Sequence, residues 1–198
     1  MQLSLCDLSA DVVTACQRAF ADADDVTIVQ GGLADLDVDA LITAGNSFGF
    51  MCGGVDAALV QAFGWQLQDR VRSAILDDFG GELPIGCAVV VDVNADRAQK
   101  LVYAPTMRIP QSVRYQPNAY LAMRAALRAV DAHNAVAFDD EKIHSVGCPG
   151  MATGAGEVPP SVAAQQMRQA YDDVVLCRPP PSTLEDARAN HVRMLKEP

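Results

Sequence analysis

The sequence predicts an α/β fold, a three-layer α/β/α sandwich around a six-stranded mixed, mainly parallel sheet. Short apolar runs typical of buried strands alternate along the chain with longer stretches whose apolar residues recur at helical spacing. Polar, glycine-rich segments follow two of these runs, as loops do at the carboxyl ends of parallel strands. With 198 residues the chain is long enough for one domain with a buried core, and short for two.

The expected strands are short runs rich in Val, Leu, Ile and Ala. They occupy residues 3–6, 26–30, 40–44, 87–93, 100–105 and 143–149. The run ALITA at 40–44 is apolar at nearly every position, which is typical of a central strand buried on both faces. The valine-rich runs at 87–93 and 100–105 have the composition that strands favour.

Four amphipathic stretches are expected to form helices. They span about 10–21, 55–78, 118–133 and 161–177. In the first, Val12, Cys16 and Phe20 fall on one face, and Ser9 is expected to cap the N-terminus. The second is expected to be interrupted around Gly64, because glycine is unfavourable inside a helix.

One domain is expected over residues 1–177. The segment RPPPS at 178–182 ends the regular pattern, because proline interrupts helices and central strands. Residues 178–198 are therefore expected to form a proline-rich C-terminal extension, in which TLEDARANHVRMLK has the pattern of one short helix. Whether this helix packs back on the domain is left open by the pattern.

Composition and charge indicate the cellular environment of the protein and the kind of partner it binds. No run of eighteen apolar residues occurs, and the start, MQLSLCDLSADVV, lacks the basic residues of a secretory signal. The six cysteines are scattered without a CxxC pair, which favours a reducing cytoplasm over a disulfide framework. A formal net charge of −10 argues against a nucleic-acid partner, which would need clustered Lys and Arg. We therefore expect a cytoplasmic protein with a small partner and no membrane contact.

Two glycine-rich loops are expected to form a ligand site. The first, AGNSFGFMCGGVDAAL at 44–59, runs from a strand into a helix, and Gly53 and Gly54 let a ligand approach the free N–H groups there. The second, PGMATGAGEVPPS at 149–161, can point successive N–H groups at a diphosphate. The first loop alone is a weak signal, because it matches neither GxGxxG nor the Walker pattern. Together the two loops indicate a site that grips a diphosphate from both sides.

These segments resemble the macro domain, a family that binds ADP-ribose. The stretch VQGGLADLDVDALITAGNSFGFMCGGVDAAL is similar to the family's first ligand-binding region, and PGMATGAGEVP is similar to its phosphate-binding loop. The resemblance covers about residues 1–177. The segments NSFGFMCGGVD, GELPIG, APTMRIP and PGMATGAG further resemble a bacterial and phage subgroup, the tail-protein-like macro domains.

The resemblance implies a role for each matching residue. Asn46 would bind the hydroxyls of the distal ribose, and Asp56 matches the acid that directs water in hydrolytic members. The implied ligand-binding residues are Gly31, Gly32, Leu33, Ala44, Gly45, Cys52, Gly53, Gly54, Val55, Gly150, Thr153, Gly154, Ala155 and Gly156. No cofactor is implied.

Two departures from the family pattern bear on selectivity. The adenine-recognising Asp of the family falls on Gly32, so poor discrimination between purines is expected. Aromatic residues that many hydrolytic members carry in the second loop are replaced by Gly156, Glu157 and Val158.

Plainer roles compete at several positions. Asn46 is also a common turn residue that pins its own loop, and Asp56 is also a usual helix-start acid. Cys52 lies near a helix N-terminus without a neighbouring His, which makes a nucleophilic role weak. The histidines at 133, 144 and 191 lack metal-ligand spacing, so no metal is expected.

Three functions therefore stand as hypotheses. The first is an enzyme that hydrolyses an ADP-ribosyl derivative at the distal ribose, such as mono-ADP-ribosyl-protein or O-acetyl-ADP-ribose. The second is a reader that binds ADP-ribose or a related nucleotide without turnover. The third is a phage-derived structural component that keeps the fold and has lost the site. The same loops serve the first two, so the sequence does not separate them.

Overall fold

The computed structural model of the chain describes residues 1–93 and 98–197. One six-stranded sheet has the order β2-β1-β6-β3-β5-β4, with every neighbouring pair parallel except the antiparallel pair β4 and β5. The strands are β1 (Gln2–Asp7), β2 (Val26–Gln30), β3 (Ala40–Asn46), β4 (Val89–Asp92), β5 (Lys100–Met107) and β6 (Ser145–Cys148). The predicted mixed, mainly parallel sheet is confirmed.

Residues 1–93 and 98–197 also contain six α-helices and two short 3-10 turns. The α-helices are α1 (Ala10–Ala19), α2 (Gly54–Phe63), α3 (Gln66–Phe79), α4 (Asn118–Val136), α5 (Pro160–Val174) and α6 (Leu184–Leu195). The 3-10 turns are η1 (Leu33–Asp35) and η2 (Asp139–Glu141). The predicted interruption at Gly64 is confirmed, because this residue ends α2 at a φ of +91° that suits glycine.

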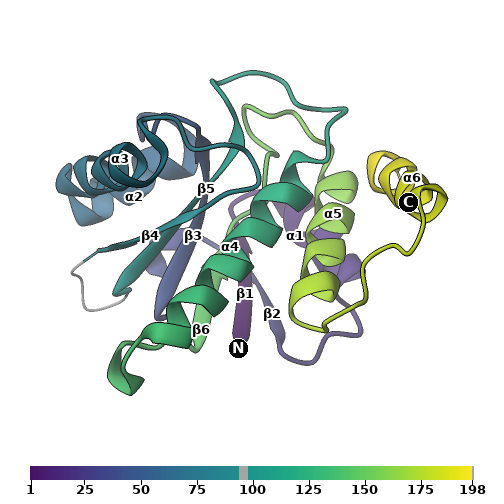
Figure 1. The fold of residues 1–198 in the computed structure, drawn as a ribbon, viewed down its shortest axis with the longest axis horizontal. Helices are drawn as coiled ribbons and strands as arrows, with labels where there is room; N and C mark the ends of the chain where they lie inside the picture. Colours follow the sequence, from purple (N-terminus) through teal and green to yellow (C-terminus); the bar gives the residue numbers. More distant parts are fainter. Residues whose placement is uncertain (94–97, 198) are drawn as a thin grey trace.

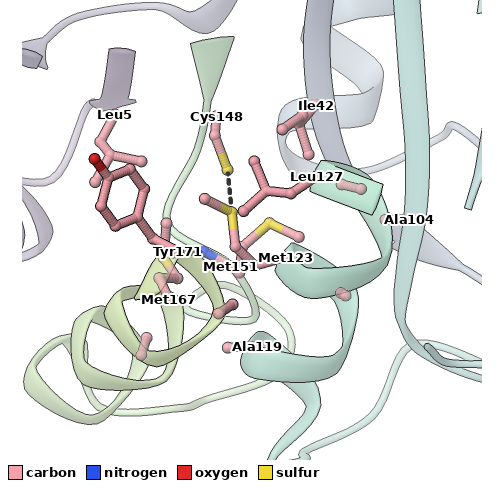
Figure 2. Packing of buried hydrophobic residues seen from close by; sticks show 14 of the residues in the cluster. Leu5, Ile42, Ala104, Ala119, Met123, Leu127, Cys148, Met151, Met167 and Tyr171 are labelled. Carbon is pink, nitrogen blue, oxygen red and sulfur yellow. Dashed lines mark hydrogen bonds between the residues drawn. The ribbon is translucent and has the colours of Figure 1, made fainter. Parts of the chain in front are cut away.

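Two apolar cores, one on each face of the sheet, make the three layers. On one face, α1, α4 and α5 pack on the sheet around residues such as Leu5, Met123 and Tyr171 (Figures 1 and 2). On the other, α2 and α3 pack on it through residues such as Leu59 and Val71. Figure 2 shows the thiol of Cys148 directed at the sulfur of Met123, 3.5 Å away, inside the first core.

The strand order brings the two predicted ligand loops together. Strand β3, which leads into the first loop, pairs with β6, which leads into the second. Both strands are parallel, so their carboxyl ends point to the same edge of the sheet. The segments after β5 and β6 also lie at this edge, at the top of Figure 1.

Two local expectations differ from the structure. Ser9 occupies the N-cap position of α1, but its hydroxyl makes no capping bond, so the predicted side-chain cap is wrong. Its backbone N–H instead donates to Asp7 Oδ1 at 2.9 Å, which already fixes the turn before the helix. The strand expected over 87–93 is shorter, because Cys87 N–H donates to the carbonyl of Pro84 in a turn that precedes β4.

The segment after α5 contains a short helix, α6. Thr183 caps it by accepting a hydrogen bond from the Asp186 N–H at 3.1 Å. The helix packs back on α5 and lies at the outer side of that helix in Figure 1. Within the described part of the chain, no helix has the length and apolarity needed to cross a bilayer.

Candidate functional site

The end of β3 is held by the side chain of Tyr103 from the neighbouring strand β5. The Tyr103 hydroxyl accepts a hydrogen bond from the Asn46 N–H and donates one to the Asn46 carbonyl, both at 2.9 Å. The ring passes so close to Gly45 that a Cβ there would lie 2.0 Å from the hydroxyl oxygen. Only glycine therefore fits at position 45, and the register of β3 against β5 shifts between Gly45 and Asn46.

The side chain of Asn46 shapes the first loop from within. Its Oδ1 accepts from the N–H groups of Phe48 at 3.1 Å and Phe50 at 3.4 Å, and its Nδ2 donates to the Phe50 carbonyl at 2.7 Å. The plainer role of Asn46, pinning its own loop, is thus present in the structure. A carboxamide carries two N–H donors, and one of those of Asn46 is used by the Phe50 carbonyl.

Two arginines cover the aromatic rings of this loop. The guanidinium of Arg72 lies 4.7 Å from the centre of the Phe50 ring, and that of Arg108 lies 5.0 Å from the centre of the Phe48 ring. Arg108 also donates to both carboxylate oxygens of Glu82, at 2.6 and 3.0 Å. Each ring therefore has an arginine over one face, although Phe50 is 47% exposed, and Arg108 is also engaged by Glu82.

The first loop ends in an uncapped helix start. Gly53 is the N-cap of α2 and has no side chain to cap it, and the first bond within the helix runs from Ala57 N–H to the Gly53 carbonyl. The N–H groups of Gly54, Val55 and Asp56 precede that bond. A Cβ built on Gly53 or Gly54 would meet nothing within 4 Å, and both glycines are exposed at the start of the helix.

Asp56 points from the first turn of α2 into the protein. Its carboxyl is 4% exposed, and Oδ1 accepts a hydrogen bond of 2.5 Å from the hydroxyl of Thr43 on β3. Burial raises the pKa of Asp56 from 3.8 to about 6, and the bond from Thr43 acts in the opposite sense. The carboxyl is therefore a buried acid beneath the loop.

The second loop is held in a strained conformation by bonds to its own backbone and to the segment between β5 and α4. The Ala152 carbonyl accepts from the Val158 N–H at 3.1 Å, and the Gly156 carbonyl accepts from the Val113 N–H at 2.8 Å. Ala152 and Glu157 both have positive φ, at 61° and 54°. Gly154 is exposed, and a Cβ there would meet nothing within 4 Å. The turn around Gly154 thus faces open space.

Asp7 joins the ends of β1, β2 and β6. Its carbonyl accepts from the Gly31 N–H, and its Oδ2 accepts from the Gly150 N–H, both at 3.1 Å. The hydroxyl of Thr153 donates to the Gly150 carbonyl at 3.0 Å. The N–H of Gly150 is thus directed at Asp7, and Gly150 fixes the base of the second loop.

A second carboxylate lies beside Gly32 at the end of β2. A Cβ built on Gly32 would lie only 2.6 Å from Oδ2 of Asp35, so this oxygen sits where a side chain at position 32 would begin. Gly32 itself has an ordinary extended backbone, with φ −79° and ψ 134°. Asp35 N–H donates to the Gly32 carbonyl, which closes the 3-10 turn that holds this arrangement.

The sheet edge brings together most of the residues named from the sequence. Gly31, Gly32 and Leu33 follow β2, Ala44 to Asp56 span the first loop, and Gly150 to Gly156 form the second. Cys52 is exposed in the first loop, and Leu33 is buried. Across residues 1–93 and 98–197, no three His, Cys, Asp or Glu side chains gather as a metal-binding group.

Three residues of this edge received no role in the site from the sequence. Tyr103 anchors the first loop, Asp7 ties the second loop to β1, and Asp35 borders Gly32. The position of Asp7 at the end of a predicted strand was a usable signal, because such ends meet at the ligand edge. Asp35 lies three residues after Gly32, and only the turn between them brings the two together.

Comparison with protein families matches the macro domain over residues 42–167. A protein of Aquifex aeolicus is 31% identical over 144 residues, which cover 72% of this chain and 78% of the relative. An O-acetyl-ADP-ribose deacetylase of Cronobacter sakazakii is 30% identical over 158 residues, which cover 79% and 82%.

Solved structures show the same fold. The macrodomain of Mycobacterium tuberculosis DarG aligns with a TM-score of 0.59 at 21% identity, covering 72% of this chain and 87% of that one. An Oceanobacillus iheyensis macrodomain solved with ADP aligns with a TM-score of 0.56 at 20% identity, covering 70% and 72%. At these identities the likeness concerns the fold alone.

The buried carboxyl of Asp56 predicts a pH-dependent stability. The pKa of Asp56 is about 6 in the folded state and 3.8 in the unfolded state, so the folded state holds this proton more tightly. The stability that the bound proton contributes is therefore lost as pH rises through 6. Asp56→Asn removes the titration. From pH 4 to pH 8 the unfolding free energy of the variant should gain about 2–3 kcal/mol relative to wild type. Denaturant unfolding at both pH values measures this, and a pH-independent difference would contradict it.

Proposed function

The chain belongs to the macro-domain family, and on that premise we propose that it binds ADP-ribose or a related nucleoside diphosphate across the carboxyl edge of its sheet. The observation that carries this proposal is that the two glycine-rich loops follow neighbouring parallel strands and so lie at the same edge of the sheet. The uncapped start of α2 lies after β3, and the exposed turn around Gly154 lies after β6. Backbone N–H groups on both sides suit a diphosphate.

The proposed contacts follow from this placement. The diphosphate lies between the N–H groups of Gly54 and Val55 and those of the Thr153–Gly156 turn, and the distal ribose lies by the free N–H of Asn46. Binding by backbone donors is compatible with a formal net charge of −10, because it needs no excess of basic side chains. Solved macrodomains of this fold have been described with ADP and with ADP-ribose, which supports the ligand class. Membership of the tail-protein-like subgroup stays a prediction.

A second candidate function is hydrolysis of an ADP-ribosyl derivative. A relative with 30% identity is an O-acetyl-ADP-ribose deacetylase, and a carboxyl whose pKa is about 6 is suited to general-base work near neutral pH. Asp56 is 4% exposed and bonded to Thr43, so this role requires the first turn of α2 to direct the carboxyl outward. Binding without turnover requires no such change, and the geometry therefore favours the binding proposal.

The base of the ligand is proposed to be recognised by Asp35. The absence of a carboxylate at Gly32 led to an expectation of poor purine discrimination. Asp35 Oδ2 lies 2.6 Å from where the Cβ of residue 32 would be, so a carboxylate is present there after all. A carboxylate accepts a hydrogen bond from an exocyclic amine, and adenine carries such an amine.

The binding proposal predicts a charge effect at Gly154. Calorimetry of the wild type should give a micromolar Kd for ADP-ribose, about −7 to −9 kcal/mol. Gly154→Asp fits the open space and places a negative charge against the diphosphate, which should weaken binding by about 10-fold or more. The isosteric control Gly154→Asn should change affinity far less. Equal affinities for the two variants, or no binding of ADP or ADP-ribose by folded wild type, would overturn the proposal.

The hydrolysis proposal predicts a split between turnover and affinity. Asp56→Ala should lower release of acetate from O-acetyl-ADP-ribose by about 10²–10⁴-fold, the usual contribution of a positioned base. Its Kd for ADP-ribose should change little, whereas Asn46→Ala should damage both quantities. Wild-type protein that binds ADP-ribose and releases no product from O-acetylated or protein-linked substrates would leave the binding function alone.

The base proposal predicts that moving the carboxylate preserves selectivity. Asp35→Ala should reduce the preference for ADP-ribose over its hypoxanthine analogue by about 5-fold, or about 1 kcal/mol, which is the typical net value of one hydrogen bond. The double variant Gly32→Asp/Asp35→Ala should restore the preference, because the backbone of Gly32 accepts any side chain. Calorimetry with both ligands tests this, and an unchanged preference in Asp35→Ala would refute it.

A further inference from the structure

One buried side chain connects the C-terminal helix to the segments behind the ligand edge. Gln166 on α5 is fully buried, and its Oε1 accepts from the Tyr120 N–H at 3.2 Å. Its Nε2 donates to the carbonyl of Gln116 at 3.1 Å and to that of Met194 at 3.2 Å. A single amide thus joins the first turn of α4, the segment before it and the last turn of α6.

The segment before α4 in turn supports the second glycine-rich loop. The Gln116 N–H donates to the Val113 carbonyl at 2.9 Å, and the Val113 N–H donates to the Gly156 carbonyl at 2.8 Å. A Cβ on Gly156 would lie 3.0 Å from the side chain of Val113 and 2.5 Å from the Ala152 carbonyl, so the contact leaves little freedom. In Figure 1 the segment between β5 and α4 arches over the segment between β6 and α5.

Helix α6 is attached mainly through its last turn. Met194 is its buried residue, at 8% exposed, and Gln165 Nε2 donates to the Arg193 carbonyl at 3.2 Å. Leu184 and Val192 on the same helix are exposed. The turn that attaches α6 is therefore the same turn to which Gln166 donates its hydrogen bond. The whole of α6 lies outside residues 42–167, the part of the chain that matches the family.

We propose that α6 is a brace for the second glycine-rich loop, with Gln166 as the positioning residue that transmits its docking to Gly156. The proposal rests on the proposed diphosphate ligand. When Met194 is seated, its carbonyl and that of Gln116 share the Gln166 amide, which fixes the 113–116 turn and through it the loop. Loss of the brace lets the loop sample other conformations, and its N–H groups then converge less often on the ligand.

The test compares affinity for ADP in variants of the full chain. Gln166→Met keeps the length of the side chain and removes its hydrogen bonds, and Met194→Ala removes the anchor of α6. Both should raise the Kd for ADP by about 3- to 10-fold, and amides of residues 154–158 should exchange with deuterium faster. Binding of adenosine, which has no diphosphate, should be unchanged.

Two controls separate bracing from simple stabilisation. Val192→Ala alters an exposed residue of the same helix and should leave the Kd for ADP unchanged. Asn134→Leu removes bonds to both backbone groups of Ile143, before β6 and remote from the ligand edge, so it should lower stability alone. If Gln166→Met fails to fold, Met194→Ala carries the test.

The outcomes are distinguishable from failure of the proposed function. If wild type binds ADP and both brace variants bind it equally well despite a lower melting temperature, the brace is refuted and the binding function stands. If Asn134→Leu weakens binding as much as Gln166→Met, the effect is one of stability and the brace is again refuted. If wild type binds neither ADP nor ADP-ribose, the proposed function is refuted, and the brace proposal, which rests on it, is refuted with it.

Discussion

The contact between Tyr103 and the end of β3 is the constraint on which the ligand edge depends. The hydroxyl of Tyr103 satisfies both backbone polar groups of Asn46 at the residue where the strand pairing shifts register. The ring occupies the space of a side chain at Gly45, and β3 ends one residue later at Asn46, where the Ser47 N–H still donates to the Met107 carbonyl at the end of β5. The direction of the first loop, the internal bonds of Asn46 and the start of α2 all follow from this one buried contact.

Carboxylates at this edge lie beside the glycine-rich loops, while three glycines of those loops border open space. Asp7 is engaged by the N–H groups of Ser9 and Gly150, and Asp56 is turned inward to Thr43. The open space lies at Gly53, Gly54 and Gly154. An acidic protein can thereby present a local surface of N–H donors. The partial positive charge of the backbone dipoles attracts an anion at short range, where the net charge of the whole protein has little effect.

The layers, the sheet and the two loops were predictable because they rest on local patterns. Apolar runs such as 40–44 and the break at Gly64 carry their own signal. The inward direction of Asp56 was not predictable, since an acid in a first helical turn is usually solvated. The nearness of Asp35 to Gly32 and the bond from Gln166 to Met194 depend on a tight turn and on the packing of distant segments, which no sequence window contains.

The central claim, that both loops close on one diphosphate, is tested most directly by following backbone amides during a titration. In a ¹⁵N spectrum of the wild type, added ADP-ribose should shift the amides of Gly54, Val55 and Thr153 to Gly156 together, with one common Kd. Adenosine should leave these amides in place. Shifts confined to one loop, or two loops that respond with different affinities, would contradict the account.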